Sequence, residues 1–453
     1  MQGGGRRFDP GTLHDDRPAN AGLVSETQYD RRVEGWELAT IAFVLLVFAA
    51  VARRLESSVI TSAIFFTSAG LLAGPVLGLV DLSIRAEPVK LLAEATLTLV
   101  LFADASRISL PALRNEFAVP LRLLAIGLPL TILAGMLAGV AVLPGMSLVE
   151  ALVLSIMLAC TDAALGQAVV TDERIPSRIR QGLNVESGLN DGICVPLFFI
   201  ALALAEAEEG ALTAHAAVQL VLEEIGYGLV GGVAAGVLGA LALRFATRRS
   251  FVEPHWFQIL TVATAVLSAG IATGLGGSIF IAAFTGGFVF GVIRPSSGGD
   301  VSYLLDEGGE VLNAVTFIVF GAVILGPALD DLGWEIVVYA VLSLTVVRMV
   351  PVALSLLGTG ARRPTLAFVG WFGPRGLATI VFAVILIDES SLPHEQTMLL
   401  AVVATIAISV YAHGLSSRPL TDRYVRWYAS DKRDELPPME SVPAAEHRWR
   451  TTR

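Results

Sequence analysis

Thirteen apolar stretches dominate the chain, and most are about as long as the ~20 residues that a helix needs to cross the ~30 Å hydrocarbon core of a membrane. They cover residues 37–53, 58–80, 89–106, 117–142, 149–171, 181–205, 213–242, 255–274, 278–294, 309–328, 333–357, 365–388 and 394–416. Only 16% of all residues are charged, whereas soluble proteins carry about a quarter. The sequence therefore predicts an all-α polytopic membrane protein with about 13 transmembrane helices, and it excludes a cytosolic enzyme or a disordered regulator.

Positive charge in the loops predicts the topology, because Lys and Arg favour cytoplasmic connections. The odd-numbered connections contain thirteen such residues, namely Arg53, Arg54, Arg107, Arg114, Arg174, Arg178, Arg180, Arg244, Arg248, Arg249, Arg294, Arg362 and Arg363. The even-numbered connections contain only Arg85 and Lys90. We therefore expect a cell-membrane protein with its N-terminus outside and its C-terminus in the cytoplasm. A net charge of −10 also argues against a nucleic-acid partner.

The two ends of the chain are polar and short. Residues 1–36 form a polar N-terminal tail without the apolar region of a signal peptide. Residues 37–417 form a membrane transport domain, and residues 418–453 form a short cytoplasmic tail. The two cysteines, Cys160 and Cys194, lie in apolar stretches and cannot build a disulfide framework or a zinc site alone. We expect them only to pack, and we expect no cofactor.

Four charged side chains lie deep inside predicted spans, where an ionisable group costs at least ~2.5–3.5 kcal/mol and usually marks function or a compensating pair. They are Asp162, Asp191, Arg348 and Arg375. At a helical rise of ~1.5 Å per residue, each lies ~14–15 Å from the cytoplasmic end of its segment. Two of these segments run inwards and two run outwards. The shared depth therefore predicts one cluster of charges at the middle of the membrane.

Helical spacing separates two carboxylates within the sixth segment. Ser187 and Asp191 are four residues apart and share a face, as do Glu186 and Asn190. Glu186 and Asp191 point roughly 140° apart around the helix axis, so they face different neighbours. One carboxylate can therefore bind a cation while the other neutralises a fixed arginine.

Two spans contain helix-breaking residues near the same depth. The Gly373-Pro374 pair removes a backbone donor from the twelfth segment. The fifth segment has the weaker breakers Thr161 and Gly166. Interrupted helices in corresponding positions of two halves point to the binding site of a transporter. The two segments are seven apart and cross in opposite directions, which predicts an inverted repeat.

Together these residues resemble the bacterial NhaP and eukaryotic NHE type of sodium/proton antiporter, over about residues 37–417. The motif residues are Thr161-Asp162, Glu186-Ser187, Asn190-Asp191, Arg348 and Gly373-Pro374-Arg375-Gly376. The resemblance implies an NhaA-like inverted repeat with two crossed, unwound helices. It also implies a homodimer in the lipid membrane, in which each protomer has a dimerisation bundle and a six-helix core. The implied activity is exchange of Na⁺ (or Li⁺ or K⁺) for H⁺ by alternating access.

The resemblance also implies which residues hold the ion. Asp191 is the shared site for the cation and the proton, and Na⁺ is held by Asp191, Ser187 and Thr161. Asn190 supports this site and places the chain with the electroneutral members, which exchange one cation for one proton. Asp104 is the candidate for a further carboxylate from the third segment, although it lies near the cytoplasmic end of that segment.

The resemblance also implies that four further charged residues have their charges balanced. Asp162 and Arg375 balance the partial charges of the crossed, unwound helices. Glu186 pairs with Arg348. We therefore expect Asp191 to be the carboxylate that is left to bind the transported ion.

Other classes of membrane protein stay open at this point. A sodium-coupled solute symporter or a cation channel could use a related inverted-repeat scaffold, although no additional polar pocket accompanies the carboxylates. A non-transporting receptor or scaffold would need a soluble output domain, which the sequence lacks. No nucleophile–base pair or metal cluster indicates an enzyme, so we expect none.

Overall fold

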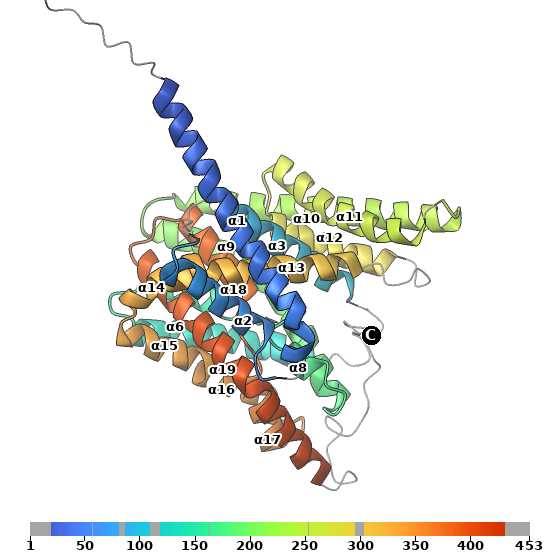
Figure 1. Ribbon diagram of the computed structural model, residues 1–453. Coiled ribbons are helices and arrows are strands. Elements are labelled where there is room, and N and C mark those ends of the chain that lie inside the picture. Colours follow the sequence, from blue (N-terminus) through green and yellow to red (C-terminus); the bar gives the residue numbers. More distant parts are fainter. Residues whose placement is uncertain are drawn as a thin grey trace, which may run out of the picture.

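Helices build the computed structural model of this chain, which describes residues 20–56, 58–80, 87–108, 118–162, 164–251, 253–294 and 303–430 (Figure 1). The α-helices are α1 (Asn20–Glu56), α2 (Ser62–Leu71), α3 (Glu87–Ser106), α5 (Ala118–Arg122), α6 (Leu128–Val142), α7 (Leu148–Met157), α8 (Gln167–Val170), α9 (Ser177–Glu208), α10 (Ala214–Arg248), α11 (Pro254–Leu275), α12 (Ile279–Ile293), α13 (Tyr303–Val319), α14 (Gly326–Ala328), α15 (Trp334–Leu344), α16 (Val346–Ser355), α17 (Arg363–Trp371), α18 (Leu377–Glu389) and α19 (Glu395–Ser430). Wider π-helical turns are η1 (Leu72–Val76), η2 (Leu123–Gly127) and η3 (Phe320–Leu325), and η4 (Leu329–Asp331) is a 3₁₀ turn. The described residues contain no β-strand, which confirms the predicted all-α class.

Helix length and composition agree with a protein that crosses a membrane many times. Within the described chain, eight helical segments are long and apolar enough to span it: α1, α5 with α6, α9, α10, α11, α13 with α14, α15 with α16, and α19. Four shorter apolar helices, α2 with η1, α7, α12 and α18, coincide with four more of the predicted stretches. The remaining stretch is occupied by α3. Each of the predicted segments therefore contains helix, and α7 and α18 are short because α7 ends at a break in its span and α18 begins after one.

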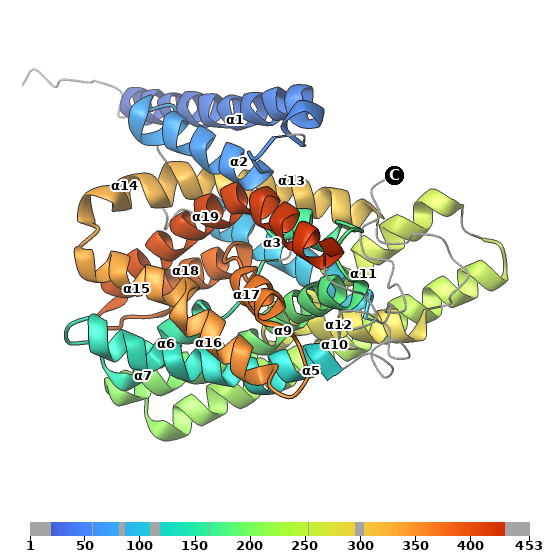
Figure 2. The same ribbon diagram turned by 90° about the horizontal axis from the view of Figure 1, so that it is seen from below.

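The helices pack into two groups that touch along α3 and α9. In one group α10 lies against α11 and α12, while α3 packs on α12 and α13. In the other, α7 packs on α6 and α9, and α15 packs on α19, α6 and α16. Figure 2 shows α6, α7 and α15 at one side of the molecule and α11 at the other. Contacts of α3 with α18 and α9 join the groups, so the break at the start of α18 lies close to the boundary between them.

Two helices extend beyond the ranges that the sequence predicts for the membrane domain. α1 begins at Asn20, inside the expected polar tail, and α19 continues past residue 417 to Ser430. Residues 1–19 and 431–453 of the two predicted tails lie outside the described residues. The extension of α19 is not a free tail, because Tyr424 is 4% exposed and stacks on Phe368 with ring centroids 4.4 Å apart. The hydropathy pattern did not predict this extension, because it packs through an aromatic face and has no long apolar run.

An ion pair lies beside this extension. Arg174 donates to Asp172 and also contacts Asp422 of α19, with nitrogen–oxygen distances of 2.7 and 3.0 Å. Hydrogen bonds from the Arg174 guanidinium lower the pKa of Asp172 from its usual value. Because the folded pKa is depressed, the pair contributes stability above the unfolded pKa of about 3.9 and loses it only as the pH falls through the folded value. The contact therefore persists at neutral pH.

We expect apolar packing, rather than the ion pair, to hold the extension of α19. Tyr424→Ala removes a buried aromatic ring and should destabilise the extension by about 3–5 kcal/mol. Limited trypsin digestion of the detergent-purified protein, followed at Arg423 and Arg426, should then show faster cleavage. Arg174→Ala is the control and should leave cleavage near the wild-type rate, because exposed ion pairs contribute little. Equal cleavage of Tyr424→Ala and wild type would contradict this prediction.

Candidate functional site

Two interrupted helices meet at their breaks. The first helix stops at residue 157 as α7 and resumes at residue 167 as α8, and the second stops at residue 371 as α17 and resumes at 377 as α18. The backbone N–H of Asp162 in the first break donates to the carbonyl of Pro374 in the second, at 2.8 Å. Backbone that is not helical thus lies in the interior of the protein. Such backbone needs side chains to satisfy it, since no water is available in a membrane.

The Asp162 carboxylate satisfies N–H groups on both sides of the crossing. Its Oδ1 accepts hydrogen bonds from the N–H groups of Ala164 and Leu165, at 2.7 and 3.3 Å. Its Oδ2 accepts from the N–H of Leu377, the first residue of α18, at 2.9 Å. N–H groups at a helix start carry a partial positive charge. The buried carboxylate therefore has its charge offset by backbone dipoles.

Arg375 performs the reciprocal task from the second break. Its Nη1 donates to the carbonyls of Ala159 and Cys160, at 2.6 and 2.8 Å. These carbonyls lie just beyond the end of α7, where partial negative charge accumulates. The backbone N–H of Arg375 donates to the Ser409 hydroxyl on α19, at 2.7 Å. Each break is thus completed by a charged side chain from the other break.

Two glycines allow these charges to approach the backbone so closely. A Cβ at Gly376 would overlap the Asp162 carboxylate, and a Cβ at Gly373 would come within 2.5 Å of the Arg348 Nε. Both distances are shorter than any that real Cβ atoms show, so neither position can carry a side chain without a shift of its neighbours. The Gly373-Pro374-Arg375-Gly376 turn therefore combines a helix break with room for charged neighbours on both sides.

Glu186 and Arg348 form a bidentate ion pair between α9 and α16. The distances are 2.5 Å from Nη1 to Oε1 and 2.8 Å from Nη2 to Oε2. Their side chains are 4% and 3% exposed, respectively. In a buried pair of this kind each charge needs the other, because a single uncompensated charge in the interior is strongly unfavourable. The charges of Glu186 and Arg348 are therefore matched.

Polar side chains of α9 attach this helix to the first break. The Asn190 Nδ2 donates to the Ala159 carbonyl at 2.9 Å and lies 3.5 Å from the Thr161 hydroxyl. The Ser187 hydroxyl donates to the Thr161 carbonyl in a short hydrogen bond. Ser187, Asn190 and Thr161 are all buried. Two of the oxygens predicted to hold a cation, the Thr161 carbonyl and the Ser187 hydroxyl, are thus adjacent and bonded to each other.

Asp191 differs from the other acidic residues at the crossing. Its Oδ1 is fully buried and has no hydrogen-bond partner among the described residues. The side chain lies close enough to Asp162, Asp104 and Arg375 for their charges to act on it. A buried carboxylate oxygen without a strong donor is unfavourable unless a proton or a cation neutralises it. The arrangement is therefore able to bind either one.

Asp104 lies on α3, in the other group of helices. Its Oδ1 is 3.5 Å from Arg107 Nη1, and Arg107 also forms a close ion pair with Asp306 of α13. The structure therefore places Asp104 in a charged network near the end of α3, within electrostatic reach of Asp191 rather than among the residues bonded at the crossing.

A small cavity lies beside the crossing. Its volume is about 20 Å³, which is enough for one water molecule. Its polar lining comes from Thr161, Asp162, Glu186 and Ser187. No group of three or more His, Cys, Asp or Glu side chains in the described chain is arranged to hold a metal ion. Asp191 does not line this cavity. The two carboxylates that do, Asp162 and Glu186, are already bonded to backbone N–H groups and to Arg348, respectively.

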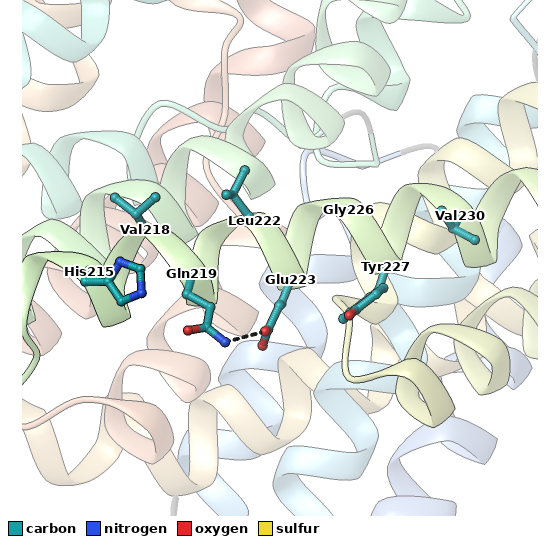
Figure 3. A pocket seen from close by; sticks show the side chains of 8 residues that line it. All are labelled: His215, Val218, Gln219, Leu222, Glu223, Gly226, Tyr227 and Val230. Atoms are coloured by element: carbon teal, nitrogen blue, oxygen red, sulfur yellow. Dashed lines mark hydrogen bonds between the residues drawn. The ribbon is translucent and has the colours of Figure 1, made fainter.

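A much larger hollow lies elsewhere, along the exposed face of α10. Its volume is about 530 Å³, and α10 side chains line it at helical spacing from His215 to Val230 (Figure 3). Within it, Gln219 donates a hydrogen bond to Glu223 at 2.8 Å. None of the predicted site residues lines this hollow. A choice of the site by cavity volume alone would therefore select the α10 hollow and not the charged crossing.

Four residues at the crossing were not predicted as part of the site. They are Cys160, Cys194, Thr379 and Ser409. The Thr379 hydroxyl donates to the Met157 carbonyl at the end of α7, at 3.0 Å. Cys194 donates to Asn190 at 3.1 Å, and its position four residues after Asn190 was a usable signal. No comparable signal marks Thr379 or Ser409, because their contacts depend on how distant helices cross.

Sequence comparisons place this chain among membrane transport proteins. The family profile described as "Sodium/hydrogen exchanger, transmembrane" matches residues 40–423. Na(+)/H(+) antiporter 2 of Zygosaccharomyces rouxii is 27% identical over 280 residues, which cover 56% of this chain and 34% of that protein. The Na(+)/H(+) antiporter of Saccharomyces cerevisiae is 28% identical over 282 residues, which cover 57% of this chain and 28% of that protein. The aligned part is thus about a third or less of the length of these curated relatives.

A solved structure shares the fold. The sodium proton antiporter MjNhaP1 from Methanocaldococcus jannaschii, determined at pH 8, aligns with a TM-score of 0.71 and 19% sequence identity. The alignment covers 87% of this chain and 99% of that chain. At this identity the likeness supports a common architecture, while the residue geometry rests on the contacts described above.

We expect the Glu186–Arg348 pair to be required for stability. Arg348→Ala leaves a buried, unpaired carboxylate and should cost about 3–5 kcal/mol. The double variant Glu186→Leu with Arg348→Met should recover most of this loss, because well-packed apolar pairs often replace a buried ion pair without penalty. Gel filtration of heated, detergent-solubilised samples measures both. If Arg348→Ala has the same melting temperature as the wild type, the ion pair does not contribute to stability.

Proposed function

The chain belongs to the transmembrane sodium/hydrogen exchanger family, a family of transporters rather than enzymes, and from this premise we propose that it exchanges Na⁺ for H⁺ across a membrane. The observation that carries the proposal is the Asp191 carboxylate, whose buried Oδ1 has no hydrogen-bond partner among the described residues. Asp162, Arg375 and the Glu186–Arg348 pair are each matched by backbone dipoles or by an opposite charge. One carboxylate is thereby left for the transported ion.

Competition for Asp191 couples the two ions. A proton and a Na⁺ each neutralise the carboxylate, and both need the same oxygens. The group of helices that carries the site can then move with either ion bound. An empty, charged carboxylate is costly to carry through the low-dielectric interior, which suppresses uncoupled leak. Alternating access of one site therefore gives exchange of Na⁺ for H⁺.

We propose the Thr161 carbonyl and the Ser187 hydroxyl as the further ligands of the cation. The hydroxyl already donates to this carbonyl, so the two oxygens lie together beside the first break. When Na⁺ arrives, the Ser187 O–H rotates away from the Thr161 carbonyl and keeps its proton. Both oxygens can then direct a lone pair at the ion. The negative charge of Asp104 reaches Asp191 and attracts the cation on its way to the site. Li⁺ or K⁺ would use the same oxygens.

The proposed stoichiometry is one cation for one proton. Asn190 stands beside Asp191 and contributes no charge, because its side chain is a neutral amide; its Nδ2 donates to the Ala159 carbonyl. One positive charge then moves in each direction, and the membrane potential does no net work on the cycle. A second net charge would couple the exchange to the potential at ~2.3 kcal/mol per 100 mV.

We further propose that the protein works as a homodimer in a cell membrane, with its C-terminus in the cytoplasm. The excess of arginine in the odd-numbered loops supports this orientation.

We expect Asp191→Asn to abolish exchange while leaving the fold intact, because the amide keeps the shape but neither binds Na⁺ strongly nor takes up a proton. The measurement uses liposomes that contain the purified protein and an internal pH dye. Addition of NaCl or LiCl should move protons in the wild type, and choline chloride should not. Glu223→Gln is a matched control on α10, away from the crossing, and should retain wild-type activity.

The same liposomes test the stoichiometry and the alternatives. Valinomycin with K⁺ should leave the exchange rate unchanged if the cycle is electroneutral. A current that tracks Na⁺ without proton movement would indicate a channel, and proton movement only in the presence of an organic solute would indicate a symporter. Full activity of Asp191→Asn would refute the assignment of the site.

A further inference from the structure

One face of α19 carries polar side chains along the second break. Ser409, His413 and Ser416 follow one another at spacings of four and three residues, which places them on the same side of the helix. Ser409 and His413 are buried, and Ser416 is half-buried. α19 packs against both α17 and α18, which are the two pieces of the second interrupted helix (Figure 2). The polar face therefore lies where that helix is not continuous.

Contacts from this face reach both the end of α17 and the break itself. Trp371, the last residue of α17, donates from its Nε1 to the Ser416 hydroxyl at 2.9 Å. The Trp371 ring also lies against the His413 imidazole, with ring centroids 4.9 Å apart. Within the break, the backbone N–H of Arg375 donates to the Ser409 hydroxyl at 2.7 Å. α19 thus holds the chain before the break and inside it.

His413 determines how the Ser409 hydroxyl is oriented. The Nδ1 atom of His413 lies 3.0 Å from the Ser409 carbonyl oxygen and 3.1 Å from the Ser409 hydroxyl oxygen. The contact with the carbonyl needs a proton on Nδ1, because a carbonyl oxygen only accepts. A serine side chain has several staggered rotamers. The contact with the imidazole favours the rotamer in which the hydroxyl oxygen also meets the Arg375 N–H.

The position of Arg375 in turn affects the first break. Its Nη1 donates to the carbonyls of Ala159 and Cys160, at 2.6 and 2.8 Å. The next carbonyl along the chain is that of Thr161, the proposed ligand of the cation. If the Arg375 backbone lost its contact with α19, the guanidinium could withdraw from the two carbonyls, and the Thr161 carbonyl would shift with them.

We propose that Ser409 and His413 are positioning residues of the exchange site. They hold the Arg375 backbone, and Arg375 holds the stretch of the first break that ends at Thr161. Neither residue touches the ion. This inference rests on the proposed Na⁺/H⁺ exchange and deepens it, because a binding site needs its ligands held to within about 0.5 Å. Loss of either contact should therefore weaken Na⁺ binding more than it slows the maximum rate.

The test uses full-length variants in liposomes, with the initial rate of proton movement measured against Na⁺ concentration. Ser409→Ala removes the acceptor of the Arg375 N–H. It should raise the apparent KM for Na⁺ roughly three- to tenfold, about the effect of one lost hydrogen bond, with a smaller change in the maximum rate. If Ser409→Ala does not fold, Ser409→Cys keeps the size of the side chain but offers only a weak sulfur acceptor, and it should raise the KM in the same direction.

Two variants of His413 separate positioning from packing. His413→Phe keeps a ring against Trp371 but lacks the Nδ1 contact, and it should raise the KM for Na⁺. His413→Asn lacks the ring but presents an amide group at the place of Nδ1, and it should keep the KM near the wild-type value. A purely structural role would give the opposite order, because phenylalanine fills the buried space better than asparagine does.

A control on the same helix is Thr405→Val. It removes a buried hydroxyl, one turn before Ser409, that donates to the Ala401 carbonyl of its own helix at 2.6 Å, and it should keep the wild-type KM. The positioning role is overturned, with Na⁺/H⁺ exchange left in place, if Ser409→Ala and His413→Phe both keep the wild-type KM or if His413→Asn has the higher KM of the His413 pair. Absence of Na⁺-dependent proton movement in the wild type would instead overturn the proposed function itself.

Discussion

The crossing of two broken helices is the arrangement on which the rest of this structure depends. Backbone groups at membrane depth have no water to bond with, so each exposed N–H and carbonyl needs a partner from the protein. Asp162 accepts from the start of α18, and Arg375 donates to carbonyls beyond the end of α7. Because each break is completed by the other, the two form a single unit. That unit brings charge into the interior without leaving it unmatched.

The same short stretch of backbone serves both the fold and the ion site. The Ala159 carbonyl accepts from Arg375 and from Asn190, and the Thr161 carbonyl accepts from Ser187. Residues 159–161 therefore join the charge-compensating arginine to the proposed ligands on α9. A shift of this stretch would move the ion ligands and the helix dipoles together, so the state of the ion is mechanically linked to the packing of both broken helices.

Helix α19 connects this crossing to the cluster of aromatic and apolar residues around Tyr424. Its Ser409 hydroxyl accepts from the Arg375 backbone, and its Trp371 neighbour donates to Ser416 at 2.9 Å. About two turns further along, its extension packs Tyr424 against Phe368. One continuous helix thus contacts the break, the end of α17 and the apolar cluster at the inner ends of the helices. Rigid contacts of this kind favour movement of the whole group over local bending of one helix.

Local properties of the sequence determined the all-α class and the ranges of the apolar segments, and they predicted a shared depth for Asp162, Asp191, Arg348 and Arg375. Length, hydropathy and helical spacing act between residues that are close along the chain, so they can be read directly. Only the tertiary structure decided which charge completes which helix end, that α19 continues to Ser430 and that Asn190 reaches the Ala159 carbonyl. Asp162 and Leu377 are 215 residues apart. Contacts at such separations depend on how the helices cross, and that crossing is a property of the whole packed chain.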